Sequence, residues 1–301
     1  MLLALIKTLR PRQWTKNLLL FAGLVFSHNL TNGLMALKAC AGFVVFCALS
    51  GVIYILNDLA DAESDKAHPR KRLRPIASGA LSVRAAWGGA VVIGVAALGG
   101  AFSVGVPFGV CAGIYFVLML AYSFLFKHVV ILDLMLLALG FVLRAIAGVW
   151  AIRSVEASVL LTSWFLACTF FLALFLAICK RRHELILLEG QAQSHRPVLE
   201  EYSPAFLDQM VSVATAATII CYAIYATVYV HHPQGDAAAR LDGNSPMIYT
   251  LPFVVYGVFR YLYQVYRRDQ GGAPETVLLT DKWLIVNIGL WGATVLYILY
   301  A

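Results

Sequence analysis

The chain has 301 residues, of which 61% are hydrophobic and only 13% are charged. A soluble protein carries about 25% charged residues, because polar groups must cover most of its surface. A disordered chain would be poor in apolar residues. The composition therefore indicates an integral membrane protein, and 23 Lys and Arg against 16 Asp and Glu give it a net charge of +7.

Nine apolar stretches are long enough to predict transmembrane helices of about 20 residues each. They lie at 17–36, 39–59, 83–101, 104–125, 129–152, 158–179, 206–230, 246–266 and 280–300. The segment before them is too short in apolar residues for a signal peptide, and it is predicted to lie along the membrane interface with Pro11 and Trp14 at its edge. We expect one all-α polytopic membrane domain over residues 1–301.

The basic residues are shared unevenly between the two sides of the membrane. Nineteen of the 23 fall at the N-terminus and in the even-numbered connections. This bias predicts a cytoplasmic N-terminus and an external C-terminus; the membrane expected is a plasma membrane of bacterial type. Twelve of the 16 carboxylates share the basic side, although Asp and Glu contribute little to orientation. We therefore expect a polar reaction site at the cytoplasmic face.

The second predicted span ends in Asn57-Asp58-Leu59-Ala60-Asp61-Ala62-Glu63-Ser64-Asp65. On a continuous helix, Asp58, Asp61 and Asp65 line one face, where like charges repel. A hard cation offsets that repulsion, and Mg²⁺ typically takes one or two carboxylates together with substrate phosphates. Asn57, Asp58, Asp61 and Asp65 are the predicted Mg²⁺ ligands. The alternative is a solvated acidic helix end paired with nearby Lys and Arg.

A basic loop, Lys66-Ala67-His68-Pro69-Arg70-Lys71-Arg72-Leu73-Arg74, follows directly. Phosphate binds Arg through two hydrogen bonds and Lys as a point charge. Bases directly after three aspartates therefore suit a polyanionic ligand that is partly bound to metal. Lys71, Arg72 and Arg74 join Asp58 and Asp61 as the predicted catalytic set; the alternative is an ordinary positive-inside loop. No chemistry is assigned to His68, and the six cysteines are expected to be core residues.

These motifs resemble a known family. NDxxDxxxD followed by HPxKRxRPIASG is similar to the first aspartate-rich motif of the UbiA superfamily of intramembrane prenyltransferases. The segments 9–17, 127–133 and 140–148 narrow the resemblance to the decaprenyl-phosphate phosphoribosyltransferases, over nearly the whole length but weakly between 231 and 246. The resemblance implies nine helices around a chamber open to the cytoplasm, in which Mg²⁺ bridges the aspartates to a diphosphate.

The resemblance also implies the reaction: a 5-phosphoribosyl group passes from phosphoribosyl diphosphate to a decaprenyl-like polyprenyl phosphate, in the making of a cell-wall arabinan precursor. The partners expected are these two substrates and membrane lipids, without nucleic acid, and the oligomeric state is left open. Two alternatives remain. One is an aromatic prenyltransferase that uses a polyprenyl diphosphate, and the other is a transporter.

One departure from the wider superfamily bears on the choice. Where other members carry a second aspartate motif after the sixth span, this chain has Lys180-Arg181-Arg182-His183-Glu184. Three bases and one Glu suit a site for a free phosphate, so these residues are predicted to bind substrate. For Glu184, an i,i+4 ion pair with Lys180 is an equal alternative.

Further predicted substrate-binding residues are Arg10, Arg12, Lys16, Asn17, Tyr122, Lys127 and Arg144. Arg144 lies well inside the predicted span 129–152, about 16 Å along the helix from Asp133, which is too far for direct pairing. It is expected to meet a carboxylate from another helix or a bound phosphate. Tyr122 has the alternative of an interfacial belt residue. Four residues of the eighth connection are expected to close the site: Arg260, Glu275, Asp281 and Lys282.

Overall fold

The computed structural model describes residues 1–67, 71–157, 159, 161–187, 197–199, 201–228, 245–268 and 274–301. Within these residues the secondary structure is helical, and no strand occurs. Seven described helices are long and apolar enough to cross a membrane. They are α3 (Gly33–Ala60), α5 (Val83–Val104), α6 (Val106–Phe124), α7 (Leu132–Arg153), α8 (Ser163–Leu187), α9 (Pro204–Val228) and α12 (Lys282–Tyr300). The protein is thus a multi-pass membrane protein.

The chain forms two compact units. Unit 1 comprises Met1–Phe124 and Leu143–Val159, and unit 2 comprises Leu125–Val142 and Leu160–Ala301. Helix α7 contributes its first half to unit 2 and its second half to unit 1.

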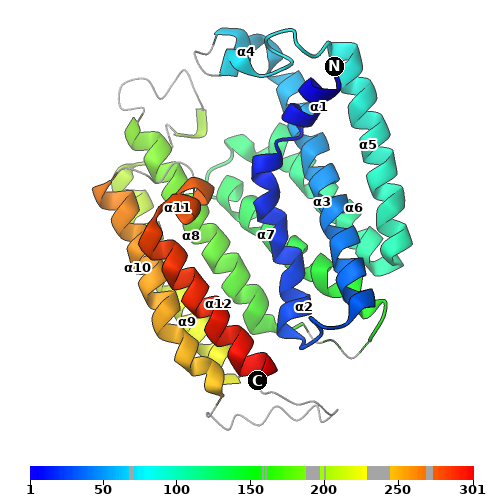
Figure 1. Ribbon diagram of the computed structural model, residues 1–301. Helices are drawn as coiled ribbons and strands as arrows, with labels where there is room; N and C mark the ends of the chain where they lie inside the picture. Colours follow the sequence, from blue (N-terminus) through cyan, green and yellow to red (C-terminus); the bar gives the residue numbers. More distant parts are fainter. Residues whose placement is uncertain are drawn as a thin grey trace. The chain divides into compact units, whose positions relative to one another are not determined.

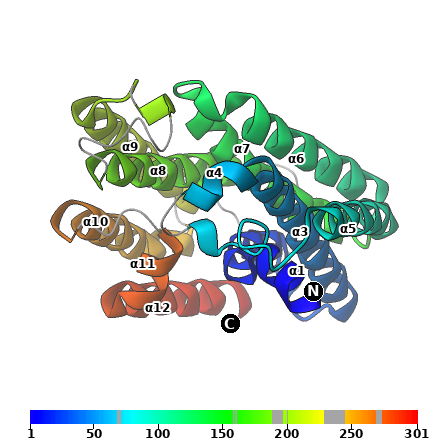
Figure 2. The ribbon, with the colours of Figure 1, turned by 90° about the horizontal axis from the view of Figure 1, so that it is seen from above.

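In unit 1, α3 is the central helix, and it packs against α5 and α6 (Figures 1 and 2). Its buried face includes Phe46, whose ring lies 5.8 Å from that of Phe108 and 4.9 Å from that of Tyr115, both on α6. The other side of α5 and α6 exposes valines such as Val92 and Val117, at 68% and 65%. Helices with one buried and one exposed apolar face are what a lipid environment requires.

The first predicted span, 17–36, is not one helix. The chain instead forms a short helix α1 (Leu2–Thr8), a 3₁₀ helix η1 (Pro11–Phe21) and a short helix α2 (Ala22–Phe26), and α3 then starts at Gly33. Asn32 is the N-cap of α3, because its side chain accepts hydrogen bonds from the backbone N–H groups of Leu34 and Met35. The stretch before α3 therefore ends at Asn32. The polar residues between 27 and 33 therefore mark a turn inside the stretch.

η1 packs in the interior of unit 1 against α3, and small residues allow its close approach to α7. A Cβ atom on Gly148 would lie 2.2 Å from the backbone oxygen of Leu20, and one on Gly23 would lie 2.9 Å from a methyl group of Val149. Leu20 is fully buried. The glycines thus fix the position of the chain just after Arg10.

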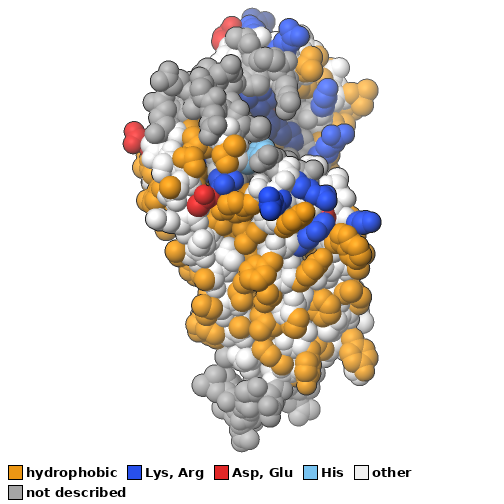
Figure 3. Space-filling view, turned by 90° about the vertical axis from the view of Figure 1, so that its left-hand side faces the viewer, with side chains coloured by type: hydrophobic (Ala, Val, Ile, Leu, Met, Phe, Trp, Pro, Cys, Tyr) orange, Lys and Arg blue, Asp and Glu red, His pale blue; other side chains and the backbone are white. Residues whose placement is uncertain are grey.

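In unit 2, α8 and α9 pack side by side, and α10 (Leu251–Arg267) lies against α9 and α12. The shorter elements are η3 (Phe126–His128), η5 (Pro197–Leu199), η6 (Pro246–Thr250) and α11 (Pro274–Thr280). The core includes Phe175 and Tyr261, with ring centroids 5.6 Å apart. The predicted span 246–266 corresponds to η6 and α10; α10 has 17 residues and is not among the seven candidate spans. The face drawn in Figure 3 is largely apolar, with Lys and Arg gathered toward one end.

Candidate functional site

The end of α3 carries a buried carboxylate held by two arginines. Asp58 is 2% exposed, and its Oδ1 accepts a 2.6 Å hydrogen bond from Nη2 of Arg10. Nη1 of Arg74 lies 3.1 Å from the same oxygen. Asp58 thus meets one base from the N-terminal segment and one from the loop that follows α4 (Ala62–Ala67). Two cations on one carboxylate offset the cost of burying it.

Asp65 shares one of these partners. It is 1% exposed, its Oδ2 accepts a 2.5 Å hydrogen bond from Arg74 Nη1, and its Oδ1 lies 4.0 Å from Nζ of Lys71. Asp58 and Asp65 therefore face the same side, as the spacing predicted, and Arg74 bridges them. We call Arg10, Asp58, Asp65, Lys71 and Arg74 the carboxylate–arginine cluster.

The helix between the two aspartates is not continuous. α3 ends at Ala60, Asp61 has φ −91° and ψ 5°, and α4 starts at Ala62. The backbone N–H of Asp61 still bonds to Asn57 O at 2.9 Å, and that of Asp65 to Asp61 O at 2.8 Å. The break is therefore small, and Asp58 and Asp65 keep a common face. The Asp61 side chain is partly exposed.

Local backbone structure places both arginines. Arg10 has a left-handed conformation, with φ 52°, between α1 and η1, and its guanidinium lies 4.7 Å from the centre of the Tyr54 ring. Arg74 follows the 3₁₀ turn η2 (Lys71–Leu73), and its backbone N–H bonds to Lys71 O at 2.9 Å. The sequence Arg-Pro-Ile-Ala-Ser-Gly then turns back, with Gly79 at φ 77°, where a side chain would be strained.

Unit 1 also contains other residues that the sequence singles out. Nδ2 of Asn57 donates to Oγ of Ser123 at 3.1 Å, so α6 holds the amide. Arg12 and Arg72 are exposed, Lys16 is partly exposed, and Tyr122 packs against the core of unit 1. His68 and Arg70 of the basic loop lie outside the described residues, as does Glu200, and the side chain of Glu275 is likewise outside them.

The oxygen donors of this cluster suit a hard cation. Among the described residues, no group of three or more Asp, Glu, His or Cys side chains forms a ready metal cage. Mg²⁺ does not need one, because it commonly takes one or two protein carboxylates and completes its shell with water and substrate phosphates. Asp58 and Asp65, each buried and sharing Arg74, fit that mode of binding, in which phosphate oxygens would supply the missing ligands.

Arg144 lies in a buried polar network of unit 1. Its Nε donates to Oδ1 of Asn17 at 2.8 Å and its Nη2 to the Tyr115 hydroxyl at 2.7 Å. Nδ2 of Asn17 in turn donates to Ser50 Oγ at 3.2 Å. Arg144 is 5% exposed and Asn17 is 1% exposed. These two neutral partners tie η1 to α6 and α7, and the role of Arg144 in binding substrate stays a prediction.

In unit 2, Arg181 is buried in an ion pair. Its Nη2 donates to Asp133 Oδ2 at 2.6 Å and its Nη1 to Glu184 Oε2 at 2.7 Å, and it is 3% exposed. The Tyr202 hydroxyl donates to Asp133 Oδ1 at 2.8 Å and accepts from the Ile131 N–H at 2.7 Å. Burial raises the pKa of Tyr202, and the bond to Asp133 acts in the same direction. Glu184 thus pairs with Arg181, and its predicted role in binding substrate stays a prediction.

Arg182 also forms an ion pair with a carboxylate of unit 2. Its Nε donates to Asp208 Oδ1, and its guanidinium lies 4.1 Å from the centre of the Tyr266 ring. The Tyr266 hydroxyl donates to the same Asp208 oxygen at 2.7 Å. Lys180 is partly exposed on α8, and Lys127 lies in η3. Two of the three bases near the C-terminal end of α8 therefore neutralise carboxylates of unit 2, and their predicted role in binding substrate stays a prediction.

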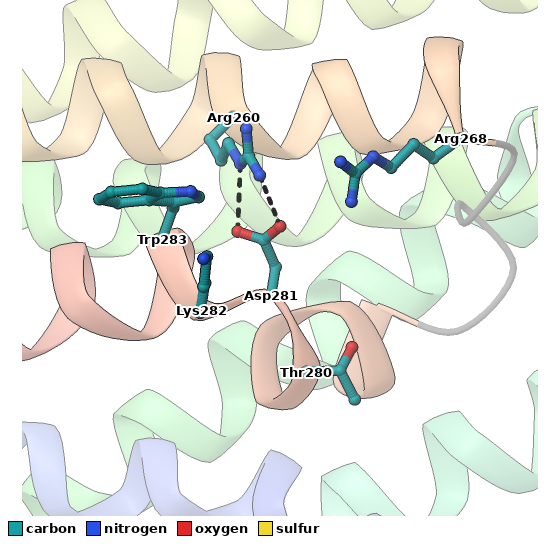
Figure 4. A pocket seen from close by; sticks show the side chains of 6 residues that line it. All are labelled: Arg260, Arg268, Thr280, Asp281, Lys282 and Trp283. Carbon is teal, nitrogen blue, oxygen red and sulfur yellow. Dashed lines mark hydrogen bonds and ion pairs between the residues drawn. The ribbon is translucent and has the colours of Figure 1, made fainter.

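A pocket of about 380 Å³ opens between the end of α10 and the start of α12 (Figure 4). Arg260 donates two hydrogen bonds to Asp281 there, from Nε to Oδ1 at 3.1 Å and from Nη2 to Oδ2 at 2.8 Å. The Asp281 side chain also caps α12 by accepting from the Leu284 N–H at 2.9 Å. The hydrogen bond from Arg260 lowers the pKa of Asp281. Arg268, Lys282, Trp283 and Thr280 complete the lining.

Sequence reasoning missed the neutral partners that hold these charges. Ser123 supports Asn57, Tyr115 supports Arg144 and Tyr202 supports Asp133. A single hydroxyl in or beside an apolar helix forms no sequence pattern that would predict such a contact. Arg268 of the pocket gives no separate signal either, because the positive-inside bias alone predicts bases in this connection.

Comparison with known proteins agrees with this fold. The model of the UbiA prenyltransferase family matches residues 18–287. The chain is 37% identical over 291 residues to the decaprenyl-phosphate phosphoribosyltransferase of Corynebacterium glutamicum, covering 95% of this chain and 84% of that protein. It is 33% identical to the protein of the same name from Mycolicibacterium smegmatis, covering 97% and 91%.

Among solved structures, the fold is similar to that of a UbiA homolog from Archaeoglobus fulgidus bound to GPP and Mg²⁺. The TM-score is 0.71 at 18% identity, and the match covers 99% of this chain and 100% of that one. At this identity the likeness shows the fold alone. Taken with the family model and the relatives, it shows that the chain belongs to the UbiA prenyltransferase family.

Proposed function

We propose that the protein transfers a 5-phosphoribosyl group from phosphoribosyl diphosphate to a polyprenyl phosphate and releases diphosphate. The observation that carries the proposal is the carboxylate–arginine cluster, in which two buried aspartates meet three bases. Such a cluster suits a ligand that brings both metal and phosphate charge. The near full-length likeness to proteins named decaprenyl-phosphate phosphoribosyltransferase supports this donor and acceptor class.

In this proposal, Asn57, Asp58, Asp61 and Asp65 would hold Mg²⁺ where the donor diphosphate binds. Bound there, the ion would stabilise the negative charge of the leaving group. Lys71, Arg72 and Arg74 neutralise the remaining phosphate charge as the ribose C1 becomes cationic. Arg10 and Arg74, which pair with Asp58 in this structure, would also offer N–H groups to the phosphate oxygens.

The bond changes need no strong base. An oxygen of the acceptor phosphate, already an anion, forms a bond to C1 as the bond from C1 to the diphosphate oxygen breaks. Attack opposite the leaving group inverts C1. The predicted contacts for the acceptor phosphate or the donor 5-phosphate are Arg12 and Lys16 in η1. The bases near the C-terminal end of α8, Lys180, Arg181 and Arg182, are further candidates. The lipid tail explains why a reaction on a soluble sugar is carried out by a membrane protein.

The proposed topology has nine membrane crossings. η1 with α2 and η6 with α10 supply two crossings beyond the seven long helices. The N-terminus and the carboxylate–arginine cluster are cytoplasmic, with the reaction chamber open to that side, and the C-terminus is external, in a bacterial-type plasma membrane. The basic bias of the even-numbered connections supports this orientation.

The test offers purified protein two donor and acceptor pairs in the presence of Mg²⁺. The first is phosphoribosyl diphosphate labelled at the 5-phosphate with a polyprenyl phosphate, and the second is a labelled polyprenyl diphosphate with hydroxybenzoate. We expect label in the lipid extract of the first and no new product from the second. The reverse result would establish an aromatic prenyltransferase. Inactivity with both pairs in folded protein would leave the transporter alternative.

A further inference from the structure

The pocket of unit 2 has the size of a small-ligand site and is built entirely from residues near the ends of α10, α11 and α12. Pockets that hold small ligands span about 300–1,000 Å³, and this one measures about 380 Å³. Arg268 at the end of α10 and Lys282 at the start of α12 project beside the Arg260–Asp281 pair (Figure 4). The pocket therefore has space for a small ligand beside the Arg260–Asp281 ion pair.

Its charge favours an anion. The lining carries three bases and one carboxylate. Asp281 pairs with Arg260 and also interacts electrostatically with Arg268, so one carboxylate faces three bases and the lining keeps an excess of positive charge. Among the described carboxylates none forms an ion pair with Arg268 or Lys282. Their cations lie instead near the rings of Tyr263 and Trp283, at 5.9 and 5.4 Å.

The surroundings are those of a membrane interface. Trp283 is 54% exposed and Tyr263 is 46% exposed, and such aromatic residues gather where hydrocarbon meets head groups. From Trp283 onward α12 is a candidate span whose outer face exposes Val286 and Leu290 at 52% and 53%. A ligand in the pocket thus has a continuous apolar surface directly beside it.

We propose that this pocket binds the phosphate head group of an anionic membrane lipid. Arg268 and Lys282 bind the phosphate, Arg260 is kept in place by Asp281 and lines the same space, and the exposed face of α12 contacts the lipid tail. Basic pockets between membrane helices recognise anionic head groups in this way. A soluble anion would leave the apolar surface unused. The lipid is a phospholipid of the bilayer or a polyprenyl phosphate, which share this chemistry.

The test measures lipid binding without turnover, so it is independent of the proposed reaction. The full-length protein in detergent is titrated with phosphatidylglycerol, a polyprenyl phosphate or phosphatidylcholine, and bound lipid is counted by native mass spectrometry. The pocket variant is Arg268→Gln with Lys282→Gln. The matched control is Arg267→Gln with Arg84→Gln, which removes two exposed bases that do not line the pocket.

We expect the pocket variant to bind an anionic lipid roughly 30-fold more weakly, since each of the two bases contributes about 1 kcal/mol near a head group, or about fivefold in affinity. The control should bind as the wild type does, and phosphatidylcholine should not distinguish the proteins. Loss for phosphatidylglycerol alone identifies a bilayer lipid, and loss for the polyprenyl phosphate alone identifies an acceptor-like lipid. Unchanged binding of both, or equal loss in the control, overturns the proposal.

A charge-preserving variant separates recognition from folding. Arg268→Lys with Lys282→Arg keeps both cations and should retain anionic lipid binding within about threefold. If it loses binding as completely as the glutamine variant, the charges are not what the lipid recognises, and the proposal fails.

Discussion

Arg10 and Asp58 lie 48 positions apart in the chain, and Nη2 of Arg10 donates a 2.6 Å hydrogen bond to Oδ1 of Asp58. The carboxylate side chain is 2% exposed, whereas that of the arginine is 32% exposed. The buried partner is therefore fixed at the end of α3, and the partly exposed one can leave it for an incoming phosphate. Arg74, 27% exposed, stands in the same relation to Asp65. These exposures support the proposal that the two arginines exchange their carboxylate partners for a bound phosphate.

Asp61→Asn should abolish turnover while the protein stays folded. The substitution keeps the shape of the side chain but removes a charged oxygen from the proposed Mg²⁺ site. We expect a loss of more than about 100-fold, since a bound metal contributes several kcal/mol to the transition state. Chelation of Mg²⁺ in the wild type should have the same effect and be reversed by adding the ion.

Glu63→Gln is the control for this substitution, because Glu63 is exposed and pairs with Lys66 at 2.7 Å. It should retain wild-type turnover. Full activity in Asp61→Asn would refute the metal role of Asp61.

Arg74→Gln should destabilise unit 1, because it leaves two buried carboxylates without their shared partner. We expect the free energy of unfolding to fall by about 2 kcal/mol, the scale of a hydrogen bond to a charged group. Arg74→Lys keeps the cation and should cost less. Thermal unfolding in detergent, followed by circular dichroism, measures both. Arg72→Gln, at an exposed base of the same loop, should leave the midpoint unchanged; an equal drop there would show that Arg74 has no special place.

Arg181→Met should destabilise the protein more strongly than Arg74→Gln. Arg181 is 3% exposed and Asp133 is fully buried, so the substitution leaves an unpaired charge inside unit 2. Breaking such a pair costs about 3–5 kcal/mol. The double variant with Asp133→Leu removes that charge and should recover part of the loss. A double variant that is no more stable than Arg181→Met would mean that the two side chains are not coupled.

Gly148→Ala should displace η1, because the added Cβ would lie 2.2 Å from the backbone oxygen of Leu20. Overpacking of this kind costs about 1–3 kcal/mol. Gly113→Ala in α6 is the matched control, since a Cβ there meets nothing within 4 Å, and a helical alanine should stabilise slightly. Thermal unfolding compares them, and equal midpoints would contradict the tight packing of η1 on α7.

The aspartate spacing predicted the cluster well because the helical period alone brings Asp58 and Asp65 to one face. It could not predict that Arg10 would join them, since that contact depends on how η1 packs through Gly148 and Gly23 onto α7. Hydropathy also did not show that the first predicted span, 17–36, contains a turn before α3. A hydropathy window averages over such a turn, because it measures how apolar a segment is and not which backbone conformation the segment has.

The sequence shows the three bases near the C-terminal end of α8, Lys180, Arg181 and Arg182, but it does not show what they bind. The sequence could not distinguish bases that meet a substrate from bases that meet Asp133, Glu184 and Asp208, because those carboxylates lie on other helices or a turn away. The structure accounts for Arg181 and Arg182 as partners of carboxylates. The proposal of a phosphate acceptor therefore depends on the carboxylate–arginine cluster and on the likeness to phosphoribosyltransferases.

The most direct measurement of the proposed reaction uses phosphoribosyl diphosphate labelled in two places. One sample carries ³²P in the 5-phosphate and the other in the β-phosphate of the diphosphate, and each is incubated with protein, Mg²⁺ and a polyprenyl phosphate before lipid extraction. The account predicts that the 5-phosphate label enters the lipid phase and that the β-phosphate label stays in water as diphosphate. Absence of the 5-phosphate label from the lipid, with folded protein, or entry of the β label, would contradict phosphoribosyl transfer.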